Sequence, residues 1–237
     1  MATQKKPSVR AGASDSTSDH RVRVARARRD RMTERLLGAV LECYAADPQH
    51  PPTVDDVIQK AGVSRATFYK YFNSVEQAAG ILGRDLGQEM VESIVTLFDG
   101  PEEPLFRVST SVLLFLMRAV IDPIWAGFVS HTDYLNQDTI PLTGMVALMG
   151  RARDAGVLEF QDTDSAGSLT VGAMMEAVRR MARTGHRDRK YVEELAAMTL
   201  RGLGLTIEDA RNVVRERTIF IRGLAPDRLS WWRDPWR

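Results

Sequence analysis

An all-α fold is predicted by two features of this 237-residue sequence. Apolar residues recur at helical spacing through most of the chain, and no stretch of useful length alternates apolar and polar residues as a strand does. Capping residues and Gly or Pro breaks divide this pattern into pieces of helical length. The composition, 44% hydrophobic and 27% charged, is that of a globular protein with a sizeable core.

The first helix is predicted over about residues 31–46. Its apolar residues lie on one helical face: Leu36, Leu37, Val40, Leu41 and Tyr44. Two pairs of helix-breaking residues, Asp47-Pro48 and Pro51-Pro52, end it. The first 20 residues are rich in Ser, Thr, Ala, Gly and Lys, which indicates a disordered segment.

Two short helices joined by a tight turn are predicted next. Thr53 and Asp56 have the spacing of a capping box and begin the first of them, which Gly62 ends. Only two residues later, Ser64 can cap a second helix over residues 65–71. A short helix, a turn and a second short helix are the sequence form of a helix-turn-helix, whose second helix enters the major groove of DNA.

All later segments are also predicted as helices. Ser74 and Gln77 form another capping box and begin a long helix that runs to about Phe98. The segment Leu105–Val120 is apolar nearly all round, as expected of a buried helix. The remaining predicted helices lie at about 125–129, 139–154, 164–183 with Asp164 as the cap, 192–203, and Thr206 to about Gly223.

Positive charge is concentrated at the N-terminus. The formal net charge of the whole chain is +1, but residues 1–31 carry nine basic and three acidic groups, a local charge of +6. The densest part contains Arg26, Arg28, Arg29 and Arg31 and leads straight into the first helix. We expect this arm to lie along a phosphate backbone or to enter a minor groove. The alternative is a solvated tail that only aids solubility.

The second short helix has a face suited to a DNA groove. Phe68 and Phe72 are spaced so that both pack inward. The side chains left to point outward or to lie along the rim are Arg65, Thr67, Lys70 and Tyr71. Ala66 keeps the start of the helix slim enough for close approach, and free backbone N–H groups at the capped N-termini near Thr53 and Ser64 can bind phosphates.

Residues 61–72, Ala-Gly-Val-Ser-Arg-Ala-Thr-Phe-Tyr-Lys-Tyr-Phe, resemble the recognition region of TetR-family transcriptional regulators. The resemblance extends over about residues 31–98. It implies contacts to bases or phosphates by Thr67, Tyr69 and Tyr71. The family commonly has a phosphate-binding Lys at the start of the fourth helix, where this chain has Val75. The basic arm can supply the charge that this departure removes.

Three parts are expected: a flexible basic arm over residues 1–29, a helix-turn-helix DNA-binding domain over 30–78, and a helical effector-binding and dimerisation domain over 79–237. The resemblance implies a homodimer that binds a double-stranded, palindromic DNA operator. It further implies a repressor that a small, largely apolar effector releases from the operator. The alternatives are an effector-independent DNA-binding regulator and an activator.

The predicted helix at 165–183 is apolar on two sides, which suits it to pack a core and a partner subunit together. One side carries Val171, Met174, Met175, Val178, Met181 and Ala182, and the other carries Leu169, Gly172, Ala173 and Ala177. With the helix at 192–203, it is predicted to form a four-helix dimer interface. The alternative is that both sides lie in one monomeric core.

The effector pocket is expected among Met and aromatic residues, because Met-rich surroundings adapt to varied apolar ligands. The predicted wall residues are Phe115, Trp125, Phe128, His131, Tyr134, Met145, Met149 and Met174. Such residues at helical spacing are also typical of an ordinary core. The C-terminal residues 230–237 hold three of the four Trp. We expect Trp231 and Trp232 to pack against the protein or across a dimer, the alternative being a partner-binding peptide.

No catalytic, cofactor or metal site is predicted. The four histidines are scattered, no Cys/His pair has metal-ligand spacing, and no Gly-rich phosphate loop or Gly-x-Ser-x-Gly elbow occurs. A helical enzyme is a remote alternative. Cys43 is the single cysteine, no apolar run reaches the length of a membrane helix, and no signal peptide is apparent. We therefore expect a cytoplasmic protein that does not enter a membrane.

Overall fold

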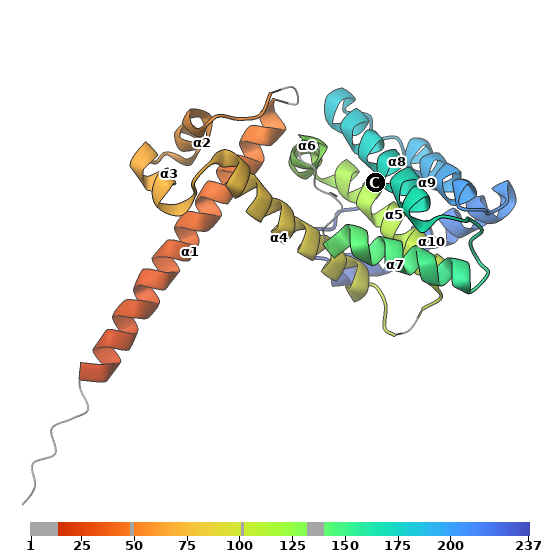
Figure 1. Cartoon of the computed structure of the whole chain (residues 1–237), viewed down its shortest axis with the longest axis horizontal. Coiled ribbons are helices and arrows are strands. Elements are labelled where there is room, and N and C mark those ends of the chain that lie inside the picture. Colours follow the sequence, from red (N-terminus) through yellow and green to blue (C-terminus); the bar gives the residue numbers. More distant parts are fainter. Residues whose placement is uncertain (1–13, 48–49, 101, 132–139) are drawn as a thin grey trace, which may run out of the picture.

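The computed structural model describes residues 14–47, 50–100, 102–131 and 140–237, and these ranges contain ten helices and no strand (Figure 1). The all-α prediction is confirmed. The helices are α1 (Ser14–Ala46), α2 (Val54–Ala61), α3 (Arg65–Tyr71), α4 (Val75–Thr96), α5 (Pro104–Ile121), α6 (Pro123–His131), α7 (Ile140–Asp154), α8 (Thr163–Thr184), α9 (Arg189–Gly202) and α10 (Ile207–Arg228).

Helix α1 is much longer than predicted. The flexible arm expected over residues 1–29 is wrong for residues 14–29, because the helix begins at Ser14 and not near residue 31; residues 1–13 lie outside the described part. The added segment contains neither Gly nor Pro and is rich in Arg, which has high helix propensity. Since the packed part of α1 has already nucleated, each added residue extends an existing helix. α1 therefore projects as one rod from the remainder of the molecule (Figure 1).

The caps of α2 and α3 are those predicted from sequence. The hydroxyl of Thr53 accepts a hydrogen bond from the backbone N–H of Asp56 at 3.3 Å, and the Asp56 carboxylate accepts the N–H of Thr53 at 2.7 Å. Gly62 ends α2 in the left-handed region at φ 62°, where glycine carries no steric penalty. The hydroxyl of Ser64 accepts the N–H of Thr67 at 3.1 Å and so begins α3. These local contacts set the turn between the two helices.

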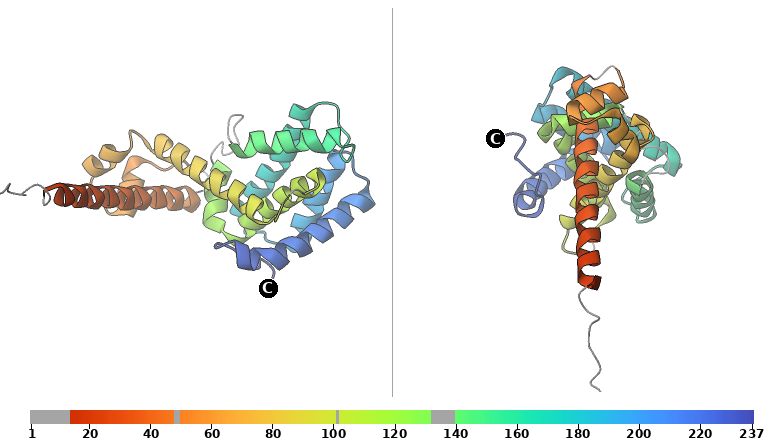
Figure 2. Two further views of the ribbon diagram at one scale, coloured as in Figure 1. Left: turned by 90° about the horizontal axis from the view of Figure 1, so that it is seen from below. Right: turned by 90° about the vertical axis from the view of Figure 1, so that its left-hand side faces the viewer.

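Helix α4 connects the helix-turn-helix to the larger part of the chain (Figure 2). The Ser74 hydroxyl accepts the backbone N–H of Gln77 at 3.1 Å, as predicted. The Gln77 side chain, however, accepts the N–H of Asn73 at 2.6 Å and not that of the capping residue. With 22 residues, α4 is about 33 Å long.

Helix α5 lies in the centre of the C-terminal bundle. Every residue from Val108 to Val120 is buried, which confirms the predicted buried helix. With 18 residues and a mean hydropathy of 1.6, α5 is long and apolar enough to cross a membrane, although the sequence pattern suggested no such segment. Of this stretch, 72% is buried inside the protein. Its apolar character is therefore accounted for by the surrounding helices.

Two helix boundaries in the C-terminal half differ from the prediction. Asp162, and not Asp164, caps α8, because its carboxylate accepts the backbone N–H of Ser165 at 2.7 Å. Helix α10 continues past Gly223 to Arg228 and includes Pro226. A glycine inside a helix costs about 1 kcal/mol. Beyond Gly223, Ala225 is buried and Leu224 packs against the core, so this last part of α10 is held by tertiary contacts.

The helix-turn-helix unit also touches the bundle directly, where α1 crosses α6. A Cβ placed on Gly127 would lie 2.8 Å from the Cα of Ala45, so glycine is required for this approach of two backbones. Beside it, the Tyr44 ring meets Phe128 and His131 edge-on, with ring centroids 5.5 and 5.8 Å away. Two connections, the chain through α4 and the α1–α6 crossing, therefore join the helix-turn-helix to the bundle.

Candidate nucleic-acid interface

Helix α3 presents an exposed face with a small side chain in its first turn and larger polar side chains after it. Phe68 and Phe72 are buried in the core, as predicted. The exposed residues of α3 are Arg65, Ala66, Tyr69 and Lys70. Thr67 and Tyr71 are half-buried, and Tyr71 packs against the hydrophobic core. Tyr71 therefore lies at the rim of this face, whereas the side chain of Tyr69 is exposed on it.

Arg65 is held by a carboxylate of the preceding helix. One guanidinium nitrogen of Arg65 lies 2.6 Å from each carboxylate oxygen of Asp55 on α2. The hydrogen bond to Asp55, and then the negative charge of the Asp55 carboxylate, raise the pKa of Arg65 above its ordinary value. Sequence reasoning missed Asp55, because no local pattern links residues ten positions apart. A DNA phosphate that binds Arg65 has to compete with this carboxylate.

The two capped helix N-termini differ in their electrostatic surroundings. At α2, hydrogen bonds from the Thr53 hydroxyl and then the Thr53 backbone lower the pKa of Asp56 below its ordinary value, so this carboxylate is ionised at neutral pH. At α3, the first turn after Ser64 contains no acidic residue. Because a helix N-terminus attracts anions, the start of α3 is electrostatically the more favourable of the two for an anion.

The arginines of α1 form an exposed basic rod. The side chains of Arg26, Arg28, Arg29 and Arg31 are all exposed, and no carboxylate lies within 4.0 Å of them among the described side chains. Successive helical residues are about 100° apart, so Arg26 and Arg29 extend the side of α1 that carries the buried Val40. The other two arginines lie on the opposite side of the rod.

The position where the family commonly has a lysine faces the interior. Val75, at the first residue of α4, is buried at 3% exposure and belongs to the hydrophobic core. The first turn of α4 carries Glu76 in place of a basic residue. The start of α4 therefore offers no cation to a phosphate.

The predicted effector residues within the described part lie on α5 to α8, and Tyr134 lies outside the described residues. Those exposed by 4% or less are Phe115, Trp125, Phe128, Met149 and Met174. Met145 is half-buried. The rings of Phe115 and Trp125 meet edge-on with centroids 5.1 Å apart. These residues pack as an ordinary core does, which is the alternative that the sequence left open. Their use as walls of an effector pocket stays a prediction.

His131 is the polar member of this group. Its Nδ1 lies 2.8 Å from the backbone carbonyl oxygen of Gly127. Since a carbonyl oxygen only accepts, Nδ1 must carry the proton, and Nε2 of the neutral ring is then an acceptor. Nε2 is buried and has no hydrogen-bond partner among the residues that the structure describes. An unmatched buried acceptor of this kind costs about 1–3 kcal/mol.

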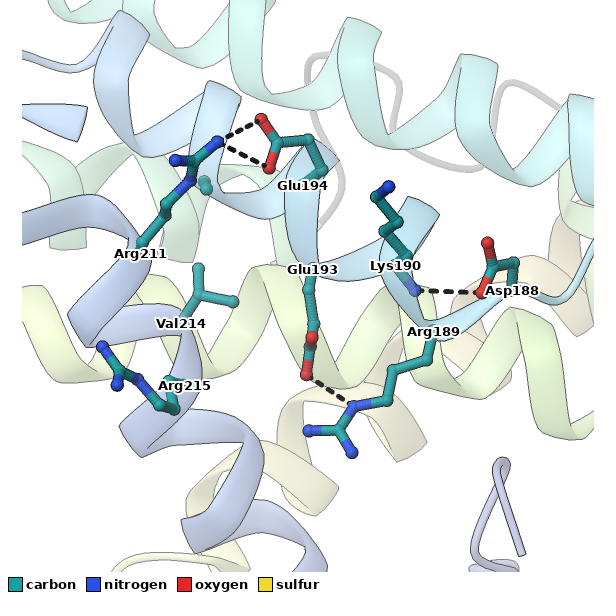
Figure 3. A pocket seen from close by; sticks show the side chains of 9 residues that line it. Asp188, Arg189, Lys190, Glu193, Glu194, Arg211, Val214 and Arg215 are labelled. Carbon is teal, nitrogen blue, oxygen red and sulfur yellow. Dashed lines mark hydrogen bonds and ion pairs between the residues drawn. The ribbon is translucent and has the colours of Figure 1, made fainter. Parts of the chain in front are cut away.

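A groove of about 600 Å³ lies between α9 and α10, and none of the predicted effector residues lines it (Figure 3). Its lining residues are Asp188, Arg189, Lys190, Glu193, Glu194, Ala197, Arg211, Val214 and Arg215. Ion pairs join Arg189 to Glu193 at 2.8 Å and Arg211 to Glu194 at 3.4 Å. The charged walls do not match an apolar effector. In the part of the chain that the structure describes, no three His, Cys, Asp or Glu side chains are arranged to hold a metal ion.

Known structures share this arrangement of helices. RolR in complex with resorcinol is 20% identical, with 79% of this chain and 95% of RolR covered and a TM-score of 0.62. FadR, a fatty acid degradation regulator from Bacillus halodurans, is 19% identical, with 73% and 97% covered and a TM-score of 0.60. A protein from Shewanella sp. PV-4 assigned to the TetR family is 16% identical, with 74% and 99% covered and a TM-score of 0.62.

The chain has the TetR-family fold. No family model matches the chain, and no curated protein matches its sequence, so the assignment rests on the shared architecture. The resemblance noted for residues 61–72 is thereby confirmed at the level of fold. In this TetR fold, α1 to α3 form the helix-turn-helix unit, α4 leads out of it, and α5 to α10 form the bundle.

Proposed function

We propose that this TetR-fold protein is a sequence-specific transcription regulator that binds double-stranded DNA as a homodimer. In this proposal it represses from a palindromic operator and leaves the operator when a small, largely apolar effector binds. The observation that supports DNA binding most directly is the exposed face of α3, with Tyr69 and Lys70 free of the core. Beside it, α1 carries four exposed arginines without carboxylate partners among the described side chains.

In the proposed interface, α3 and α1 contact different parts of the DNA. The exposed residues of α3 read base edges in the major groove, while Ser64 and the first turn of α3 contact a phosphate. The arginines of α1 neutralise further phosphates, which replaces the charge absent at Val75. Because each neutralised phosphate contributes a slope of about −0.9 to the dependence of log affinity on log salt, this role is measurable.

The test begins with DNA selected from a random pool by the full-length protein. A variant with Gln at Arg26, Arg28, Arg29 and Arg31 is then titrated with the selected DNA at several salt concentrations. We expect the salt slope to fall by up to about 4 per subunit. A selected pool without a common motif, or an unchanged slope, would contradict the proposed interface.

A control variant carries the same loss of charge at the far end of the molecule. It has Gln at four cations of the groove between α9 and α10: Arg189, Lys190, Arg211 and Arg215. If the charges of α1 act through contacts, this control keeps the slope of the unmodified protein. An equal decrease of the salt slope in both variants would mean that the total charge of the protein, and not the basic rod of α1, governs affinity.

The proposed dimer interface uses the exposed apolar surface of α8 and α9. Leu169 on α8 is 48% exposed and Met198 on α9 is 58% exposed. Gly202 leaves room for the Leu169 side chain, since a Cβ on Gly202 would lie 2.6 Å from a Leu169 methyl carbon. Apolar side chains of this size that face solvent on neighbouring helices suit a partner subunit better than water.

Charge substitution at this surface tests the dimer. We expect Met198→Glu to shift the full-length protein to a monomer in sedimentation experiments, because dimerisation would bury the carboxylate. Ile219→Glu is the matched control, because Ile219 is 66% exposed but lies on α10. A dimer that survives the Met198 change and dissociates with the Ile219 change would place the interface on α10 instead.

The proposed effector site includes His131, whose buried Nε2 lacks a partner within the described ranges. Because Nε2 is a hydrogen-bond acceptor, a ligand that satisfies it has to carry an O–H or N–H donor. The remainder of such a ligand would be apolar. RolR, of the same fold, binds resorcinol, a small aromatic molecule with such groups. His131 also contacts Tyr44 of α1, so a ligand bound there would act next to the α1–α6 crossing. Displacement of α1 would then change the spacing of the two recognition helices.

Paired probes test the effector proposal without knowledge of the natural ligand. We expect 3-methylphenol, which can donate, to release the operator at lower concentration than 3-methylanisole, which cannot. In His131→Phe, which keeps a ring but lacks the acceptor, this difference should disappear while operator binding persists. Equal responses of the unmodified protein to both probes would contradict the assigned role of His131.

A further inference from the structure

We infer that the C-terminal tail, residues 229–237, sets the position of α4, with Trp231 and Arg118 as positioning residues for the DNA-binding unit. The tail folds back onto the bundle, as expected for its Trp residues, and leaves Trp231 and Trp232 half-buried against the core. The tail does more than cover apolar surface, because it also contacts polar side chains of α4. The consequence for DNA binding rests on the proposed function, whereas the effect on α4 does not.

The first contact is a hydrogen bond between the tail and α4. The indole Nε1–H of Trp231 donates to the hydroxyl oxygen of Ser93 at 3.0 Å. The Ser93 hydroxyl in turn donates to the backbone carbonyl of Glu89 at 2.7 Å. Ser93 is 6% exposed and is the buried polar residue of α4. Both hydrogen-bonding functions of its hydroxyl are therefore used, and rotation of α4 would break the bond to the tail.

The second contact passes through the buried arginine of α5. The side chain of Arg118 is 8% exposed, and its guanidinium carbon lies 4.2 Å from the centre of the Trp231 ring. A guanidinium nitrogen lies 3.7 Å from a carboxylate oxygen of Glu89 on α4 and 3.5 Å from one of Asp122. Asp122 accepts the backbone N–H of Trp125 and so caps α6. Arg118 thus lies between α4, the start of α6 and the tail.

Trp231 lies between two anchored residues, Arg228 at the end of α10 and Asp234 in the tail. Before it, Arg228 donates to the carbonyl oxygens of Thr96 and Leu97, at the end of α4, at 3.1 and 3.2 Å. After it, Asp234 accepts from Arg222 of α10 at 2.7 Å. Trp231 is therefore presented to α4 from a segment that is held at each end. A hydrogen bond from such a segment restrains α4 more than one from a free chain end, because little chain entropy remains to be lost.

The restraint on α4 matters because α4 leads directly from the recognition helix. Only residues 72–74 separate α3 from α4, and Val75 at the start of α4 is buried in the same core as Phe68 of α3. Ser93 lies 18 residues further along one continuous helix. A change in the tilt of α4 at Ser93 is therefore carried to α3 as a rigid displacement.

Three single substitutions in the full-length protein test this role. Trp231→Phe keeps a ring over Arg118 but removes the donor, and Ser93→Ala removes the acceptor. Trp236→Phe is the matched control, because the Trp236 indole N–H donates at 3.3 Å to the carbonyl of Arg187, between α8 and α9, and not to α4. Hydrogen exchange of the α4 amides and affinity for the selected DNA are measured for each variant.

We expect exchange at residues 88–96 to rise about three- to tenfold in Trp231→Phe and in Ser93→Ala, the range for loss of one hydrogen bond. The double variant should add little, since both changes remove the same bond. The preference for the selected operator over one with an extra base pair between its half-sites should weaken in both, while Trp236→Phe keeps it. A merely stabilising tail would leave this preference unchanged.

Equal exchange of α4 in Trp231→Phe and Trp236→Phe would overturn the proposal, as would additive effects in the double variant. If Trp231→Phe does not fold, Ser93→Ala alone decides, because it lacks the same bond and keeps the tail intact. If the unmodified protein binds no DNA, the proposed function fails. The exchange measurement still decides whether the tail positions α4.

Discussion

Gly127→Ala is expected to force apart the crossing of α1 and α6. The added Cβ would lie 2.8 Å from the Cα and 3.0 Å from the Cβ of Ala45, whereas carbon atoms in contact are about 3.5–4.0 Å apart. The two helices must therefore separate by roughly 0.5–1 Å at this point. Overpacking of this kind costs about 1–3 kcal/mol, and the higher helix propensity of alanine returns about 0.5–1 kcal/mol. The net expectation is a loss of about 1 kcal/mol, and of no more than about 2.5 kcal/mol.

Thermal unfolding of the full-length protein at fixed concentration measures this loss. At about 2–4 °C per kcal/mol for a chain of this size, Gly127→Ala should lower the midpoint by about 2–4 °C, and by no more than about 10 °C. The control is Gly223→Ala on α10, where an added Cβ meets nothing within 4 Å. That variant gains only the helix propensity and should unfold slightly above the unmodified protein. If both alanines raise the midpoint equally, the backbone contact at Ala45 does not constrain the crossing and the reasoning is refuted.

Two further predictions concern single carboxylates. Hydrogen bonds from the Ser165 hydroxyl and then from the Ser165 backbone N–H lower the pKa of Asp162 below its ordinary value of 3.8. The cap therefore contributes stability above that pH and loses it as the pH falls through the folded-state pKa. The urea midpoints of Asp162→Ala and the unmodified protein should thus differ at neutral pH and converge on acidification. Asp55→Ala should raise operator affinity severalfold in anisotropy titrations, because it frees Arg65 to bind phosphate.

Matched substitutions separate these effects from general changes of charge. Asp164→Ala lies in the first turn of α8 but does not cap it, so it should leave the midpoints nearly unchanged. Glu208→Ala removes an exposed first-turn carboxylate from α10, far from the proposed DNA face, and should leave operator affinity unchanged. An increase in affinity as large as that of Asp55→Ala would mean that net charge, and not release of Arg65, is responsible.

Most of the helix-turn-helix could be predicted because its signals are local. Ser64 and Gly62 act on backbone groups within three or four residues, so their roles are readable from spacing alone. The start of α1 could not be predicted in this way. Its N-terminal segment has no apolar face to reveal a helix, and it is helical because it continues a helix that packing has already nucleated. The cap of α8 was misplaced for a related reason, since Asp162 and Asp164 are chemically equivalent as caps.

The site residues divide along the same line. Burial of Phe68 and exposure of Lys70 follow from helical periodicity, and both were predictable. The pairing of Arg65 with Asp55 was not, because it depends on how α2 and α3 cross. The buried environment of His131 also depends on packing between helices, so the sequence could name the residue but not the missing partner of its Nε2.

The sequence by itself determined the all-α class, the two capped short helices, the apolar α5 and the concentration of arginines before residue 32. Each of these depends on the residue types within one or two helical turns. Only the tertiary structure decided the approach of Gly127 to Ala45, the hydrogen bond from Trp231 to Ser93, and the position of Arg118 between α4, the start of α6 and the tail. Trp231 and Ser93 are 138 residues apart, and contacts over such separations exist only once the helices between them have packed.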